Sequence, residues 1–247
     1  MKKSKVLLAS LGFITGGAMA GTMGPVGPEL PSRVVSLSIG PAWHASGESS
    51  TLFLTPAIEK SYVAHKTSRA LAFGELFYGM QRQLGATWMG QLGLAGVVTS
   101  DAKVGGEVWD DADPAFNTRN YAYSVNHARL AIKGKVLAQL GEQWLPYVSA
   151  SIGLGFNRSH GYITPPIIFP AVADAAFASH TQTSFAWTVG LGVERSVNAN
   201  WRLGAGYELA DLGRSRLGLA PGQTQGQGLG LNHLYTNALV LSAHYLR

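Results

Sequence analysis

Ser242 and His244 are two residues apart, a spacing that places both side chains on one face of a β-strand. A hydroxyl beside an imidazole can act as nucleophile and general base in the hydrolysis of an ester. That chemistry also needs an acid that orients the imidazole, and no acid partner is identified in the sequence. We therefore assign no catalytic residue, and a lipid-modifying enzyme stays as an alternative function.

The other chemistry-bearing side chains do not form a recognisable metal motif. His127, His160, His180 and His233 show none of the close spacings that ligate zinc, so the sequence predicts no metal site. The Gly-x-Gly pairs lie inside predicted strands and do not resemble a phosphate-binding loop. We expect no cofactor.

Eight segments alternate between apolar residues and small or polar residues. Between 185 and 193, for example, Phe185, Trp187 and Leu191 share one face, while Thr188 and Gly190 lie on the other. The eight segments cover residues 35–44, 69–81, 87–99, 127–136, 147–157, 185–194, 201–209 and 239–245. A strand that crosses a membrane in a barrel must show this kind of division between lipid and lumen. The predicted fold is all-β: a membrane-spanning, eight-stranded, antiparallel up-and-down β-barrel.

The predicted lumen carries charges of both signs, which cannot face lipid. They are Glu75, Arg129, Lys133, Glu194, Arg202 and Glu208. The interior of an eight-stranded barrel is just wide enough for side chains to fill, and an unpaired buried charge costs several kcal/mol. We therefore expect these groups to pair as a polar plug, and a narrow ion or small-solute channel is the alternative.

Short and long connections follow one another in rotation along the chain. Short turns fall near residues 82–85, 138–143 and 196–200, and long loops fall at 45–68, 100–118, 159–180 and 213–232. Membrane barrels have short periplasmic turns and long extracellular loops, so both termini are predicted to be periplasmic. Trp88, Trp144 and Trp201 each follow a short turn, and we expect them to form an aromatic girdle at that membrane surface.

The third long loop is unusually apolar for a segment in water. Tyr162, Ile167, Ile168 and Phe169 are expected either to fold against the barrel rim or to contact an extracellular partner. The first long loop is expected to hold an extra short strand at residues 51–54.

The first residues match a secretory signal, with a basic start, a short apolar core and a small-residue cleavage site at Ala18 to Ala20. We predict a signal peptide at 1–20, a periplasmic arm at 21–32 and the barrel at 33–247. The chain has no cysteine and only 13% charged residues. Three of its 19 basic residues lie in the signal, which leaves 16 against 14 acidic residues and does not favour a nucleic-acid partner.

From Arg33 to Arg247 the chain resembles the OmpA/OmpX-type eight-stranded outer-membrane barrels. It is also similar to a Gram-negative family of such barrels in the short motifs GTMGPV at 21–26, GELF at 74–77, DADP at 111–114, VNHA at 125–128 and LNHLYTN at 231–237. The resemblance implies an integral outer-membrane location, with outer-membrane lipid and lipopolysaccharide as partners. The last strand resembles the signal that the barrel-assembly machinery reads, with Tyr245 near its end. The expected role is structural or surface interaction, with a possible extracellular partner bound through the loops.

Overall fold

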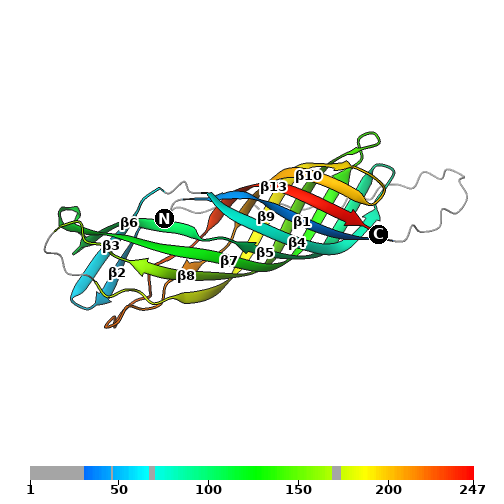
Figure 1. Ribbon diagram of the computed structural model, residues 1–247. Coiled ribbons are helices and arrows are strands. Elements are labelled where there is room, and N and C mark those ends of the chain that lie inside the picture. The colour runs from blue at the N-terminus through cyan, green and yellow to red at the C-terminus, as the bar shows by residue number, and fades with distance from the viewer. Residues whose placement is uncertain (1–30, 46, 67–69, 169–173) are drawn as a thin grey trace, which may run out of the picture.

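The computed structural model describes residues 31–45, 47–66, 70–168 and 174–247, and its main body is a closed β-barrel (Figure 1). The eight strands of the ring are β1 Ser32–His44, β4 Ala70–Gln83, β5 Trp88–Thr99, β7 Asn117–Ala138, β8 Trp144–Ile163, β9 His180–Ser196, β10 Trp201–Asp211 and β13 Tyr235–Leu246. Each strand pairs antiparallel with the ring strands before and after it in the chain, and β13 pairs with β1 to close the ring. The predicted eight-stranded up-and-down barrel is confirmed.

Some predicted segments cannot be compared with the structure. The predicted signal peptide at 1–20 lies outside the described residues, as does the arm from 21 to 30. Within the described ranges, no helix combines the length and apolarity that a helical membrane crossing needs.

The two faces of each ring strand follow the predicted alternation. On the outside, Leu37, Leu76 and Leu191 are 57%, 58% and 62% exposed, whereas Ser38 and Glu75 on the inside are 4% exposed. The outer face is therefore a continuous apolar belt and the inner face holds the polar groups. Successive side chains of a strand point to opposite faces, so this division follows directly from a period of two in the sequence.

Two glycines allow a close approach of neighbouring strands. Gly79 and Gly93 lie opposite each other on β4 and β5. A Cβ atom on Gly93 would clash with the carbonyl oxygen of Tyr78, and one on Gly79 would lie 2.5 Å from that of Leu92. A side chain at either position would push the two backbones apart, which explains why these strand-interior positions are glycine.

The short turns all lie at one end of the barrel. The predicted alternation of short and long connections along the chain is confirmed. They join β4 to β5, β7 to β8 and β9 to β10, and β13 ends at the same end of the molecule (Figure 1). At the opposite end the chain contains further strands, β2 Ser50–Thr55, β3 Ile58–Ala64, β6 Ala102–Asp110, β11 Ser215–Arg216 and β12 Gly230–Leu231, and the 3-10 helix η1 Pro114–Phe116.

The first half of β7, residues 117–125, continues beyond the eight-stranded ring. This half pairs with β6 and the second half of β7 with β5, and β3 and β2 extend the sheet from the free side of β6. The extra strand predicted at 51–54 is confirmed as part of β2. The predicted loop at 100–118 is wrong, because most of it is β6 and the start of β7. Here Val104 and Val108 on β6, and Tyr121, Tyr123 and Val125 on β7, repeat the alternation of the ring strands.

We call this end of the molecule the cap. It comprises β2, β3, β6 and η1, the parts of β7 and β8 beyond the ring, and residues 164–168, 174–179 and 212–234 of the connections. The cap has its own hydrophobic core, made of Tyr62, Val104, Val108, Tyr121, Tyr123, Val125, Tyr162, Phe177, Ala210, Leu212, Leu217, Ala220, Leu229, Leu231 and Leu234. All four long connections contribute to it. The connections are therefore packed together over the mouth of the barrel.

Candidate functional site

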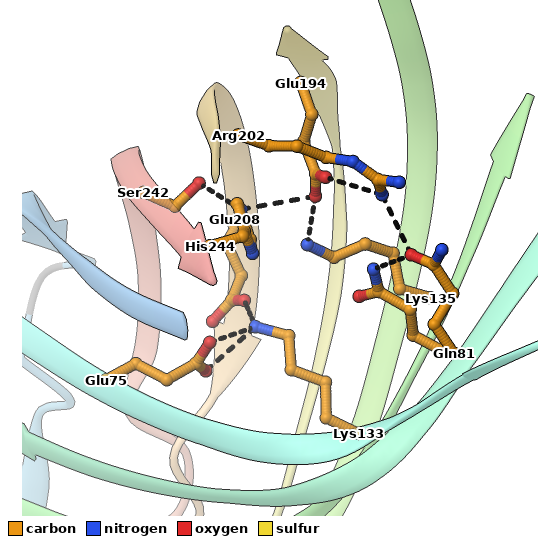
Figure 2. Close-up of polar contacts among 10 residues, drawn as sticks. Glu75, Gln81, Lys133, Lys135, Glu194, Arg202, Glu208, Ser242 and His244 are labelled. Carbon is orange, nitrogen blue, oxygen red and sulfur yellow. Dashed lines mark hydrogen bonds and ion pairs between the residues drawn. The ribbon is translucent and has the colours of Figure 1, made fainter. Parts of the chain in front are cut away.

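The centre of the lumen contains a buried group of charges from three strands (Figure 2). The Lys133 Nζ atom lies 2.6 Å and 2.8 Å from the two carboxylate oxygens of Glu75, and 3.1 Å from Oε2 of Glu208. These residues come from β7, β4 and β10, and each is an inward position of its strand. Through these contacts Lys133 connects three strands of the barrel.

Arg129 lies two inward positions along β7 from Lys133, on the side towards the cap. Its Nη2 atom is 3.7 Å from Oε1 of Glu208, and its side chain is only 1% exposed. Its Nε and Nη1 atoms have no hydrogen-bond partner among the described residues. A cavity of about 20 Å³ adjoins this guanidinium, a volume that accommodates roughly one water molecule.

A second charged group lies nearer the end of the barrel that carries the short turns and is centred on Glu194 (Figure 2). The Glu194 carboxylate is fully buried, with the Lys135 Nζ atom at 2.6 Å, the His244 Nε2 atom at 3.3 Å and the Arg202 Nη1 atom at 3.9 Å. Arg202 also donates to Oε1 of Gln81 at 2.8 Å. Together the two groups contain four basic side chains and three carboxylates, so neither sign is left without a counter-charge nearby.

All six charged residues named from the sequence thus lie in the lumen, divided between the two groups. Sequence reasoning omitted Lys135, Gln81 and His244 from the set. Lys135 had a visible signal, since it lies two residues after Lys133 and therefore shares its face. Nothing in the sequence placed His244 beside Glu194, because the two residues are on strands that are not neighbours in the ring.

Apolar layers close the lumen on both sides of these charges. On the side of the short turns the layer is formed by Met89, Leu137 and Leu145. Val34, Phe77, Ala95 and Leu246 form another buried apolar cluster in the lumen. Towards the cap, Leu71 and Phe73 pack with Ala42, Ala102 and Ala238. A further cavity of about 20 Å³ lies between the two charged groups. The lumen is therefore filled by side chains over its length, with room for about one water molecule in each cavity.

Two more glycines make room for a large side chain in the lumen, that of Tyr147. Tyr147 points into the lumen from β8, and its ring lies 4.4 Å from the Lys135 Nζ atom. A Cβ atom on Gly206 would clash with the Tyr147 hydroxyl, and one on Gly192 would lie 2.7 Å from it. These strand glycines therefore serve to fit a large lumen side chain.

The Ser242 and His244 side chains do meet, but their geometry differs from that of a catalytic triad. The Ser242 Oγ atom lies 2.8 Å from His244 Nε2, and the Glu194 carboxylate approaches the same nitrogen. A triad needs the acid on one ring nitrogen and the nucleophile on the other. His244 Nδ1 has no partner among the described residues, and the ring is 1% exposed. The arrangement is that of a buried polar contact.

The three tryptophans of the predicted girdle occupy equivalent places. Trp88, Trp144 and Trp201 are the first residues of β5, β8 and β10, and their exposed fractions are 52%, 51% and 46%. All three point outward at the end of the short turns. Trp201 packs against Tyr245, with ring centroids 5.2 Å apart, and the Arg195 guanidinium lies 5.4 Å from the Trp144 ring centroid. This places amphipathic rings in a band around that end of the barrel.

The apolar third loop is divided between the core and the surface of the cap. Tyr162 is buried, and its ring contacts the Phe177 ring edge-on with centroids 5.0 Å apart. Burial raises the pKa of Tyr162 above its ordinary value, so this phenol stays neutral. Ile167 and Ile168 are each 49% exposed at the far end of the cap. Phe169 lies outside the described residues.

A cluster of ion pairs fixes the cap strands to one another. The Lys60 Nζ atom lies 3.0 Å from Asp110 and 2.6 Å from Asp174, and Arg119 Nη1 lies 3.0 Å from Asp110. Burial alone would raise the pKa of Asp110, but the hydrogen bonds from Lys60 and Thr118 and the nearby positive charges outweigh it and hold that pKa below its usual value. Asp110 is thus ionised at neutral pH, and the cluster as a whole joins three long connections.

Metal binding has no geometric support in the parts of the chain that the structure describes. No group of three or more His, Asp and Glu side chains there lies close enough to hold an ion. Instead His65, His160 and His233 each face one carboxylate, from Glu107, Asp101 and Asp211 respectively.

Comparison with known proteins agrees with this architecture. The family model described as outer membrane protein beta-barrel domain matches residues 54–245. No curated protein sequence matches the chain. Among solved structures, the outer membrane protease OmpT from Escherichia coli has 9% sequence identity and a TM-score of 0.51, and the match covers 91% of this chain and 99% of OmpT. Matches to Ail of Yersinia pestis (14% identity, TM-score 0.39, covering 87% and 99%) and to Neisserial surface protein A (15%, 0.39, 87% and 96%) have lower scores.

Proposed function

The chain belongs to the family of outer membrane β-barrel proteins, and from this premise we propose that it is a surface-interaction barrel whose lumen is closed and whose cap contacts a partner outside the cell. Its location is the bacterial outer membrane, where it is an integral protein. The exposed apolar belt of the ring then faces lipid, and the cap lies on the extracellular side, since the short turns of such barrels are periplasmic.

One observation carries this proposal: the four long connections form a packed domain with a core of its own. A barrel that only crosses the membrane needs no such core beyond the lipid. The rigid sheet of β2, β3, β6 and β7 presents its connections at a fixed place, as binding loops on a scaffold do. The filled lumen supports the same conclusion, because buried apolar clusters and ion pairs occupy it along the described strands.

The membrane partners follow from the outer surface of the barrel. Lys103 and Arg158 are exposed on the outer face, on the cap side of the apolar residues Val98 and Phe156. Basic side chains at this level suit the phosphates of lipopolysaccharide. We also propose that β13 is the strand the barrel-assembly machinery recognises, since its outward residues from Leu239 to Tyr245 are apolar.

A narrow channel is the second candidate, and one contact favours it. Lys133 has two carboxylates within reach, so its ammonium group can keep a partner while the other carboxylate moves away. An enzymatic role is not proposed, because the Ser242 and His244 contact lacks an acid on the second ring nitrogen.

Single-channel recording of the purified protein in planar lipid bilayers tests the closed lumen. The wild-type protein should give no reproducible conductance steps. Glu75→Ala and Arg129→Ala each remove part of the central charged group and are expected to introduce brief openings, whereas Ser149→Ala in the same lumen should not. Regular open steps of the wild-type protein would reject the closed barrel and favour the channel.

A further inference from the structure

The outermost part of the cap, which we call the tip, is formed by residues 55–59, 110–118 and 163–168. Five large apolar side chains are exposed on it: Ile58 at 43%, Phe116 at 53%, Ile163 at 58%, and Ile167 and Ile168 at 49% each. They come from three different connections that the fold brings to one end. Apolar side chains gathered on a surface beyond the membrane indicate a contact site.

The tip is rigid because its connections are hydrogen-bonded to one another. The backbone N–H of Asp111 donates to the Glu59 carbonyl at 3.0 Å, and that of Ile167 donates to the Thr118 carbonyl at 2.9 Å. Below them lies the Lys60, Asp110, Asp174 and Arg119 cluster. A preorganised surface loses little conformational entropy when it binds.

The backbone of the tip is held in a costly conformation. Asp111 and Ala112 have φ angles of 52° and 54°, a region that disfavours residues with a Cβ atom and costs about 1 kcal/mol or more per residue. Asp113 then caps η1 by accepting a hydrogen bond from the Ala115 N–H, and Phe116 ends that helix. The turn therefore fixes the position of Phe116 relative to the acidic residues before it.

The charged side chains exposed on the surface of the tip are acidic. Asp111 and Asp113 are exposed and Glu59 is half-buried, while the two basic residues nearby, Lys60 and Arg119, are 8% exposed and point to Asp110 and Asp174. An anionic membrane would be repelled by this surface. Charge complementarity instead requires positive groups on the binding partner.

We propose that the tip binds a cationic, amphipathic protein segment. The apolar side chains of that segment pack against Phe116, Ile167 and Ile168, and its Lys or Arg side chains pair with Asp111 and Asp113. This inference rests on the surface-interaction function proposed above and specifies the class of partner. Conductance tests the closed lumen independently, so failure of one idea does not imply failure of the other.

The test uses the full-length mature barrel in nanodiscs of phosphatidylcholine, with empty nanodiscs as background. The probe is a short fluorescent peptide of alternating Lys and Leu, and its binding is followed by fluorescence anisotropy. A Lys and Ser peptide and a Glu and Leu peptide serve as controls. Only the Lys and Leu peptide should bind the barrel above background, and added salt should weaken that binding.

Two double variants separate the apolar and charged parts of the tip. Phe116→Ser with Ile167→Ser should weaken binding about tenfold or more. Asp111→Asn with Asp113→Asn should weaken it at low salt and reduce its salt dependence, because Asn keeps the helix cap and tolerates a positive φ while removing the charge. Leu219→Ser, a cap residue of similar exposure at 51%, is the matched control and should bind as wild type.

The proposal is overturned if the tip variants bind the peptide as well as wild type does, or if the Glu and Leu peptide binds equally. It is also overturned if the tip binds vesicles containing phosphatidylglycerol in preference to the peptide, since that would identify a membrane as the occupant. Heat-modifiability on a denaturing gel confirms that each variant retains the barrel.

Discussion

The Lys133 ammonium group lies 2.6 Å from the Glu75 carboxylate, although the two residues are 58 positions apart in the chain and both are buried in the barrel. Their strands, β7 and β4, are separated in the ring by β5. The pair therefore links two strands that are not adjacent, past the inner face of β5.

Removing one partner of this pair should be strongly destabilising. Lys133→Met leaves Glu75 and Glu208 without their shared cation, and we expect a loss of about 3–5 kcal/mol in the free energy of unfolding. Urea or guanidinium unfolding of the refolded protein in micelles measures it. The double variant Lys133→Met with Glu75→Gln should recover part of the loss. A change below about 1 kcal/mol for the single variant would show that the pair is not needed.

The glycine opposite Tyr147 should be equally sensitive to size. Gly206→Ala places a methyl group against the Tyr147 hydroxyl, and overpacking of this kind costs about 1–3 kcal/mol. Tyr147→Phe removes the contacting oxygen and should restore part of the stability in the double variant. Gly96→Ala is the matched strand control, because no other side chain or neighbouring strand lies within 4 Å of the methyl group that it adds. Equal losses for Gly206 and Gly96 would contradict the steric explanation.

Ser242→Ala should leave lipid chemistry unchanged. The hydroxyl contacts His244 within a closed lumen and lacks the geometry of an activated nucleophile. Mass spectrometry of lipid A from cells that produce the wild-type or the variant protein provides the comparison, with Ser36→Ala as a control at another buried lumen serine. A change in acylation that appears with wild type and disappears with Ser242→Ala would establish an enzyme.

Acid should loosen the cap before it affects the barrel. The folded-state pKa of Asp110 is depressed, so its contribution to stability is fully present above the unfolded-state value of roughly 4 and is lost as the pH falls through the lower folded-state pKa. Near-UV circular dichroism of the buried cap tyrosines, recorded from pH 6 downward, should report the change. Asp110→Asn should weaken the cap at neutral pH and show a smaller acid dependence. An unchanged acid profile in that variant would assign the transition to other carboxylates.

The barrel could be predicted from the sequence because membrane and lumen impose opposite chemistry on successive residues of a strand. Leu191 and Leu203 could not face a polar lumen, and Glu194 and Arg202 could not face lipid, so the period of two defined both the strands and their orientation. The same reasoning placed the charges inside. It could not show that Lys133 joins Glu75 and Glu208, because an inward position does not specify which side chains of non-adjacent strands meet in the lumen.

The cap shows where local pattern was insufficient. The alternation is as clear here as in the ring strands, at Val104, Val108, Tyr121 and Tyr123. Water surrounds this part of the protein, however, so the requirement that one face of a strand contacts lipid does not apply. The role of these four residues depends on Phe177 and Leu217, which arrive from distant connections to form a common core. The membrane-facing belt follows from the amino-acid order alone, since each residue there contacts lipid directly. The ion pairs and the cap emerge only in the folded chain, because they depend on contacts between segments far apart in the sequence.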